Sequence, residues 1–156
     1  VTDISEMFAD AESFNQPLNN WNTSNVTNMS KMFYGDKYPT RFNQPLDNWD
    51  TSNVTDMSYM FYYAESFNQP LDNWDTSNVT DMSAMFAGAT SFNQPLNNWN
   101  TSNVRDVTGG VSGPDLGMFE GATSFNQPTS RQMGYLEHQK YEQNVYRSNE
   151  IRPTAQ

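Results

Sequence analysis

The hydrophobic residues of this chain follow two alternating patterns. Between Val79 and Ala89, apolar side chains stand at offsets 0, 3, 6, 7 and 10. This spacing predicts one face of a helix of at most three turns. The preceding segment, from Phe67 to Trp74, contains a proline and is too short for a helix. It predicts a short extended piece with Phe67, Leu71 and Trp74 directed inward.

Polar residues at the start of each helical pattern support this interpretation. A short polar acceptor at the N-cap binds a free amide, and a carboxylate in the first turn favours the helix dipole. Three pairs have the spacing of an N-cap and the third helical residue: Asn53 with Asp56, Asn78 with Asp81, and Asn103 with Asp106. One unit therefore predicts an extended segment, a turn and a short helix.

The unit repeats along the chain. The string Ser-Phe-Asn-Gln-Pro-Leu-x-Asn-Trp-x-Thr-Ser-Asn-Val starts at Ser66 and Ser91 and is nearly whole at Ser13, and Arg41 replaces the serine in another copy. The tryptophans are separated by 28, 25 and 25 residues, at Trp21, Trp49, Trp74 and Trp99. The repeat is therefore 25 residues long.

Two insertions and an unrelated tail interrupt the repeat. One insertion of three residues falls within 34–41, and one of eight residues, rich in Gly and Pro, falls within 108–117. The fifth copy ends at Pro128. We therefore expect about five coils over 1–128, followed by a non-repeat C-terminal cap or arm over 129–156.

A single unit buries too few apolar side chains to offset the entropy of ordering its backbone. Stacked copies share their apolar faces, so stability becomes a sum of nearest-neighbour contacts. The aromatic positions are expected to form ladders along the stack: Trp21, Trp49, Trp74, Trp99, Phe14, Phe42, Phe67, Phe92 and Phe125.

The combination Phe-Asn-Gln-Pro-Leu-x-x-Trp-x-Thr-Ser-Asn-Val-Thr-x-Met-Ser-x-Met-Phe resembles a known repeat. Repeats of 25 or 26 residues with this pattern occur in bacterial surface lipoproteins and in algal and other protist proteins, and they are similar to BspA-like leucine-rich repeats. The resemblance covers residues 1–128. It implies an α/β repeat solenoid, right-handed and leucine-rich-repeat-like, with short parallel strands on one face and short helices on the other. It also implies binding or adhesion at a surface, with no shared catalytic residue.

Composition and charge exclude several functions. Only 35% of the 156 residues are hydrophobic, and the formal net charge is −10. Nucleic-acid binding requires clustered Lys and Arg, so nucleic acid is not expected as a partner. The chain has no cysteine for a thiolate metal site, and no apolar run approaches the length of a transmembrane segment. Because it starts at Val1 without a signal-peptide core, it is interpreted as a mature form or a fragment.

Catalysis and cofactors are not expected either. His138 is the only histidine, so neither a histidine metal cluster nor the usual nucleophile-base-orienter triad is available. We therefore predict that the chain is not an enzyme and holds no cofactor.

Calcium is the one metal that the repeat could suggest. Asp47 and Asp72 would lie one coil apart, as would Asp50 and Asp75, and like charges that close repel unless they are solvated or bridged. Solvated or amide-bonded turn residues are the favoured alternative. The equivalent positions in neighbouring copies carry amides instead of carboxylates: Asn19, Asn22, Asn97 and Asn100.

Partner contact is expected where the sequence departs from the repeat. The tail 131–156 has a net charge of +1, whereas residues 1–130 carry −11. Tyrosine and arginine are enriched in interface anchors, and an insertion is not required by the repeat itself. The candidate partner-binding residues are Tyr135, Tyr141, Tyr146, Arg147, Arg152, Asp115 and Leu116.

Two functions remain. The first is a non-catalytic protein-binding or adhesion module, extracellular or at the cell surface, which contacts a protein partner of unknown identity. The alternative is a structural or linker subunit of a larger complex, associated with an organellar membrane.

Overall fold

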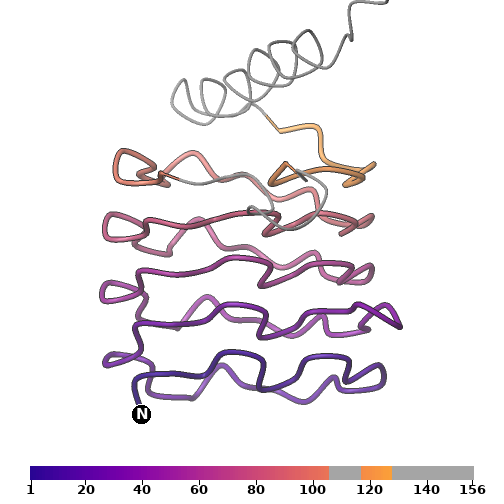
Figure 1. The fold of residues 1–156 in the computed structure, drawn as a ribbon, viewed down its shortest axis with the longest axis horizontal. Helices are drawn as coiled ribbons and strands as arrows, with labels where there is room; N and C mark the ends of the chain where they lie inside the picture. The colour runs from indigo at the N-terminus through magenta and orange to yellow at the C-terminus, as the bar shows by residue number, and fades with distance from the viewer. Residues whose placement is uncertain (106–116, 128–156) are drawn as a thin grey trace, which may run out of the picture.

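The computed structural model describes residues 1–105 and 117–127. Figure 1 shows the chain winding into coils that stack one upon another, with the N-terminus in the lowest coil. We number them coil 1 (residues 1–25), coil 2 (26–53), coil 3 (54–78), coil 4 (79–103) and coil 5 (104–127, described at 104–105 and 117–127). Equivalent residues of successive coils lie above one another.

The predicted α/β class is wrong. Neither a helix nor an extended strand occurs in residues 1–105 and 117–127. Regular pairing between coils is limited to isolated parallel bridges, which join Asp3 to Asn28, Asn28 to Asp56, and Asp56 to Asp81. A leucine-rich-repeat-like layer of helices opposite a layer of strands is therefore not present in this part of the chain.

Residues with a left-handed backbone conformation (positive φ) explain why the predicted helices do not form. In Met-Ser-x-Met-Phe, which is Ile-Ser-x-Met-Phe in coil 1, the residue x has a positive φ in four coils, at Glu6, Lys31, Tyr59 and Ala84. A second position four residues further on is also left-handed, at Asp10, Tyr63, Gly88 and Gly121. An α-helix requires negative φ throughout, so two left-handed residues in one short segment exclude it.

The segment forms consecutive β-turns instead. In coil 3, Met60 N donates to Met57 O at 3.3 Å and Ala64 N donates to Phe61 O at 3.0 Å. Each turn has its left-handed residue at the third position, as type II turns require. Turns that repeat every four residues direct side chains inward at the same intervals as a helix, so the apolar spacing did not distinguish the two.

The remaining amides of these turns bind the next coil. Alternate residues donate forward along the stack: Tyr59 N to Ser83 O, Phe61 N to Met85 O, and Tyr63 N to Ala87 O, all within 2.9 Å. Coils 1 and 2 donate in the same direction. An α-helix would use these amides within one segment, whereas here they join neighbouring coils.

The predicted helix caps have other roles. Asp56 Oδ1 accepts hydrogen bonds from Ser58 N and Ser58 Oγ, which closes a local turn beside the bridge. Asn53 Nδ2 donates to Ser24 O of the preceding coil at 2.8 Å. These residues therefore fix a turn and a contact between coils, and Asp106 lies outside the described residues.

The segment predicted to be extended and paired in parallel is held by side-chain amides. Asn68 N donates to Asn43 Oδ1 and Asn93 N donates to Asn68 Oδ1, both at 2.9 Å, and Gln94 Nε2 adds a bond to Asn68 Oδ1 at 3.1 Å. The proline of each segment, such as Pro70, has no N–H for a strand ladder. An asparagine ladder replaces strand pairing here.

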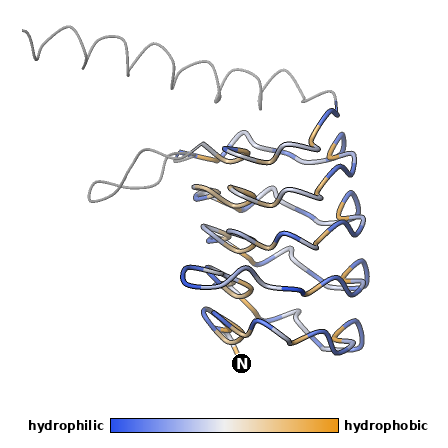
Figure 2. Ribbon diagram, turned by 90° about the vertical axis from the view of Figure 1, so that its right-hand side faces the viewer, coloured by the Kyte–Doolittle hydropathy of each residue, from blue (hydrophilic) through white to orange (hydrophobic). Residues whose placement is uncertain are grey.

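Phenylalanine forms two columns through the core. The first contains Phe8, Phe33, Phe61, Phe86 and Phe119, with centroids 5.5 to 5.7 Å apart between coils. The second contains Phe14, Phe42, Phe67, Phe92 and Phe125, with centroids 5.9 to 6.1 Å apart. All ten phenylalanines of the chain belong to these columns. Figure 2 shows apolar segments recurring at matching places in successive coils.

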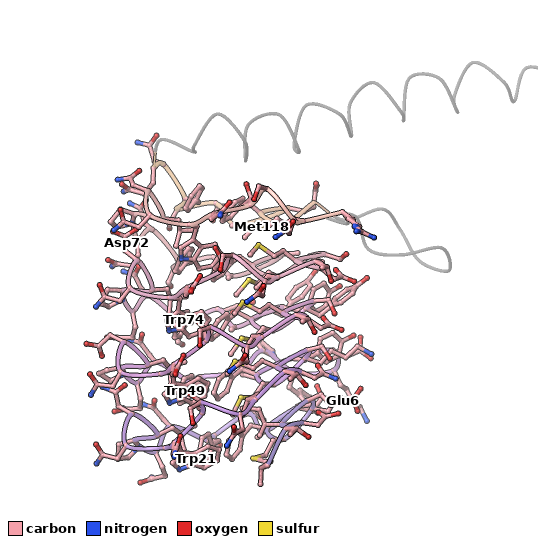
Figure 3. All side chains as sticks on the ribbon, turned by 90° about the vertical axis from the view of Figure 1, so that its left-hand side faces the viewer. Glu6, Trp21, Trp49, Asp72, Trp74 and Met118 are labelled. Carbon is pink, nitrogen blue, oxygen red and sulfur yellow. The ribbon has the colours of Figure 1, made fainter. Side chains whose placement is uncertain are left out.

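Tryptophan forms a third column near one edge (Figure 3). Trp49 and Trp74 stack at 6.3 Å with an interplanar angle of 2°, and Trp74 and Trp99 stack at 6.5 Å. Each buried indole also donates backward to a leucine carbonyl, as Trp74 Nε1 does to Leu46 O at 3.0 Å. The end member, Trp21, is 38% exposed, whereas Trp74 is 2% exposed.

Substitution at Lys31 tests the turn geometry. Its φ is 54°, so we expect Lys31→Gly to raise the free energy of unfolding by about 0.5 kcal/mol and Lys31→Val to lower it by about 1–2 kcal/mol. The ion pair with Glu6 is exposed and contributes little. Urea unfolding of the unmodified protein and the two variants measures the order of their free energies of unfolding. If Lys31 were in a helix, the unmodified protein would be the most stable of the three. If it were in a strand, Lys31→Val would be more stable than Lys31→Gly. Either order of stability contradicts a left-handed backbone at Lys31.

Candidate protein-binding surface

Most polar side chains of the repeat are used between coils. Thr23 Oγ1 donates to Asp50 O, Thr51 Oγ1 to Asp75 O, and Thr76 Oγ1 to Asn100 O, each at 3.0 Å. Among the described residues, Thr101 Oγ1 is the one buried side-chain oxygen or nitrogen without a hydrogen-bond partner. The equivalent acceptor in coil 5 would lie beyond residue 127. These groups serve stacking and leave little specific surface for a ligand.

A group of tyrosines is the exception. We call Tyr34, Tyr38, Tyr59, Tyr62 and Tyr63 the tyrosine patch. They are all the tyrosines in the described part of the chain, and all belong to coils 2 and 3. Tyr38 is 50% exposed and Tyr63 is 44% exposed. Aromatic side chains at this exposure form a surface distinct from the polar exterior of the other coils.

Four rings of the patch, those of Tyr34, Tyr59, Tyr62 and Tyr63, contact one another. Tyr34 stacks on Tyr62 with centroids 4.9 Å apart, and Tyr62 meets Tyr63 edge-on at 4.8 Å. Tyr59 contacts Tyr62 edge-on at 5.6 Å and Tyr34 at 6.2 Å. Mutual packing restricts the rotamers of these rings, so they form a preorganised surface.

The first insertion holds part of the patch in place. Gly35 N donates to Tyr62 O at 2.8 Å and Thr40 N donates to Tyr63 O at 3.2 Å, so both ends of the insertion are bonded to coil 3. Asp10 Oδ1 accepts from Asp36 N at 2.8 Å, which joins the insertion to coil 1. A Cβ at Gly35 would lie 2.5 Å from Tyr38 O, so the turn requires glycine there.

Small residues in coil 4 make room for the patch. The positions equivalent to Tyr59, Tyr62 and Tyr63 carry alanine, alanine and Gly88. The ring of Tyr63 lies against Gly88, where an added Cβ would come within 2.9 Å of the ring. Gly88 therefore serves both as a left-handed turn residue and as the support of Tyr63.

Charged groups surround the rings. Burial, followed by the nearby charge of Asp36, raises the pKa of Tyr34 to about 12. Burial also raises the pKa of Tyr62. Both hydroxyls therefore remain protonated at neutral pH. Lys31 Nζ lies 5.9 Å from the centroid of Tyr34 and also 3.5 Å from Glu6 Oε1.

The aspartates considered for calcium are bonded within the protein. Asp47 Oδ1 accepts from Asn19 Nδ2 at 2.9 Å, and Asp72 accepts from Asn98 N and Asn98 Nδ2. Asp50 and Asp75 accept from Ser52 N and Ser77 N, respectively. Within the described residues, no group of three or more His, Cys, Asp or Glu side chains could hold a metal ion.

These hydrogen bonds predict sensitivity to acid. Bonds from Ser52 and Ser77 hold the pKa of Asp50 and of Asp75 below the ordinary value of 3.8. Because the folded pKa is depressed, this stabilisation is present above pH 3.8 and is lost as the pH falls through the folded pKa. We expect Asp75→Asn, the residue type found at Asn100, to flatten the decline of the melting temperature below about pH 4. Thermal scans across this range measure the slope, and an unchanged slope would contradict the assignment.

The partner-binding residues proposed from the sequence lie outside the described residues: Tyr135, Tyr141, Tyr146, Arg147, Arg152, Asp115 and Leu116. Sequence reasoning placed the interface in the second insertion and the tail and missed the tyrosine patch. The sequence did contain a sign of the patch, namely tyrosines in the first insertion, Tyr-Gly-Asp-Lys-Tyr-Pro-Thr-Arg, and at the variable positions of Met-Ser-x-Met-Phe-x-x. Those positions carry tyrosine in coils 2 and 3 alone among the described coils.

The stacked coils and their ladders define a repeat protein with one distinctive aromatic surface. The chain belongs to the family described as Mycoplasma protein of unknown function, DUF285, whose model matches residues 1–38 and 36–150. No curated protein and no solved structure gave a significant match. In the part of the chain that the structure describes, no helix is long and apolar enough to cross a membrane.

Proposed function

We propose that this chain is a non-catalytic protein-binding module, displayed at a cell surface, that contacts its partner through the tyrosine patch. The observation that carries the proposal is the exposure of Tyr38 and Tyr63 on a support of packed rings and bonded turns. Tyrosine contributes large contact area at low entropic cost, so it is enriched at binding hot spots. The resemblance of the repeat to bacterial surface lipoproteins supports the location.

Most other polar side chains are hydrogen-bonded within the stack, which supports the tyrosine patch as the contact surface. Asparagine, threonine and tryptophan polar groups are bonded between coils, as in the bonds of Asn68, Thr76 and Trp74. A partner would therefore find fewer unused donors and acceptors at these positions. The patch can be covered without disturbing any bond between coils.

Site-specific photo-crosslinking tests the proposal. A photoreactive phenylalanine analogue would replace Tyr38, and in a matched variant it would replace the exposed Asn73, which lies beside the tryptophan column. Both proteins would be irradiated with intact cells of the source. We expect a discrete crosslinked protein from position 38 and none from position 73. Equal crosslinking at both positions, or none at either, contradicts the proposal.

A second candidate is a structural or linker subunit of a larger complex, associated with an organellar membrane. Val1 is 89%, Met7 47% and Trp21 38% exposed on coil 1. Either a further coil or a neighbouring subunit would bury these apolar side chains. If the chain is extracted from cells only within a complex that persists in high salt, the subunit function is supported over reversible binding.

A further inference from the structure

The tyrosine patch combines aromatic faces with carboxylates. Asp36 is hydrogen-bonded to the Tyr34 side chain, and Asp10 accepts from the backbone of Asp36 and Lys37. Glu6 lies on the coil 1 side of the patch, with 64% of its side chain exposed. A cation placed on this surface would therefore meet both the negative faces of the rings and nearby carboxylates.

The chain's own lysines already occupy such positions. Lys31 Nζ lies 5.9 Å from the Tyr34 centroid, and Lys37 Nζ lies 5.7 Å from the Tyr38 centroid. Both contacts are within the range of cation–π interactions. They place a cation beside two rings of this patch, and Lys37 can swing away because it is exposed.

Charge favours a basic ligand over an acidic one. The chain has a formal net charge of −10, and the charged groups beside the rings, three carboxylates (Glu6, Asp10, Asp36) and two lysines (Lys31, Lys37), sum to −1. Arginine fits better than lysine, because its planar guanidinium stacks on a ring and binds a carboxylate with two parallel hydrogen bonds. A neutral sugar can stack on the rings and donate hydroxyl hydrogen bonds to Asp36 or Glu6, but it lacks the attraction that a cation gains from their charge.

We propose that the tyrosine patch binds an arginine-bearing basic segment of a partner protein, with a guanidinium stacked on the exposed rings of Tyr38 or Tyr63 and paired with Asp36. This inference rests on the proposed protein-binding function and adds the chemistry of the partner. Lys37 is displaced from Tyr38 when the guanidinium binds.

The test uses fluorescence anisotropy with the full chain and a labelled peptide of alternating arginine and glycine. Lysine–glycine and glutamate–glycine peptides are the comparison probes. We expect the arginine peptide to bind most tightly and the glutamate peptide not to bind. Equal affinity for the arginine and lysine peptides overturns the stacking role, and tighter competition by a neutral oligosaccharide overturns the partner class.

Charge-matched variants distinguish binding at the patch from non-specific electrostatic attraction to the chain. Asp36→Asn and Asp47→Asn each remove one negative charge, but Asp47 is bonded to Asn19, away from the tyrosines. We expect Asp36→Asn, and separately the double variant Tyr38→Ser/Tyr63→Ser, to weaken binding about tenfold, and Asp47→Asn to change it less than about twofold. Equal weakening by Asp36→Asn and Asp47→Asn would identify non-specific attraction and overturn the site.

The two proposals fail in different ways. If position 38 crosslinks to a partner but the arginine peptide neither binds nor competes with that partner, the basic-segment inference is wrong and the protein-binding function stands. If no partner crosslinks at position 38, the proposed function fails. Thermal melting of each variant verifies that the stack remains folded, and the exposed positions of Tyr38 and Asp36 make unfolding an unexpected result.

Discussion

Replacing Trp74 with alanine is expected to lower the free energy of unfolding by about 3–5 kcal/mol. The indole is 2% exposed and stacks between Trp49 and Trp99 at 6.3 and 6.5 Å, so its removal opens a cavity between two rings. The change also removes the bond from Trp74 Nε1 to Leu46 O. Urea unfolding followed by circular dichroism measures the loss.

Trp21 provides the matched control for this prediction. It has the same place in its repeat but is 38% exposed and has a stacked tryptophan on one side, Trp49. We expect Trp21→Ala to cost about 1–2 kcal/mol, because less apolar area returns to water. If both substitutions destabilise equally, stability does not depend on the packing of the tryptophan column.

Loss of one asparagine should break the ladder between coils 3 and 4. Asn68→Ala removes the Oδ1 that accepts from Asn93 N at 2.9 Å and from Gln94 Nε2 at 3.1 Å. A partly buried backbone amide then loses its acceptor, and we expect the free energy of unfolding to fall by about 1–3 kcal/mol. Chemical unfolding measures the change, and hydrogen exchange at the Asn93 amide is expected to accelerate.

Two controls identify the hydrogen bond as the cause. Asn68→Asp retains an acceptor oxygen and should preserve slow exchange at Asn93. Asn126→Ala removes the corresponding side chain in coil 5, whose Oδ1 has no partner among the described residues, so we expect little loss. Fast exchange at Asn93 in Asn68→Asp would contradict the role of Oδ1.

The equivalence of positions could be predicted from the sequence, because a 25-residue repeat aligns residues such as Trp49 and Trp74 without knowledge of the backbone. The local conformation could not. Apolar residues at offsets 0, 3, 6 and 7 satisfy both a helix and a series of four-residue turns. Ordinary residues such as Lys31, Tyr59 and Ala84 gave no sign of a positive φ, which glycine would have suggested.

The asparagine ladder and the tyrosine patch escaped prediction for different physical reasons. Asn68 was interpreted as part of a paired extended segment. Whether a side-chain oxygen can replace a backbone acceptor depends on the separation of two coils, which the sequence does not contain. The tyrosines are scattered along the sequence at Tyr34, Tyr38, Tyr59, Tyr62 and Tyr63. Stacking of the coils places Tyr34 on Tyr62, which has the equivalent position in coil 3. The first insertion brings Tyr38 to the same side through its bonds to coil 3.

The hydrogen bonds between coils run in both directions along the stack. Turn amides such as Phe61 N donate toward the C-terminal coils, whereas Trp74 Nε1 and Asn68 N donate toward the N-terminal coils. Their dipoles therefore oppose one another, in contrast to the aligned peptide dipoles of a helix, which accumulate partial charges at both ends. The ends of the stack therefore carry smaller partial charges than the ends of a helix, and this electrostatic contribution does not favour one number of coils over another.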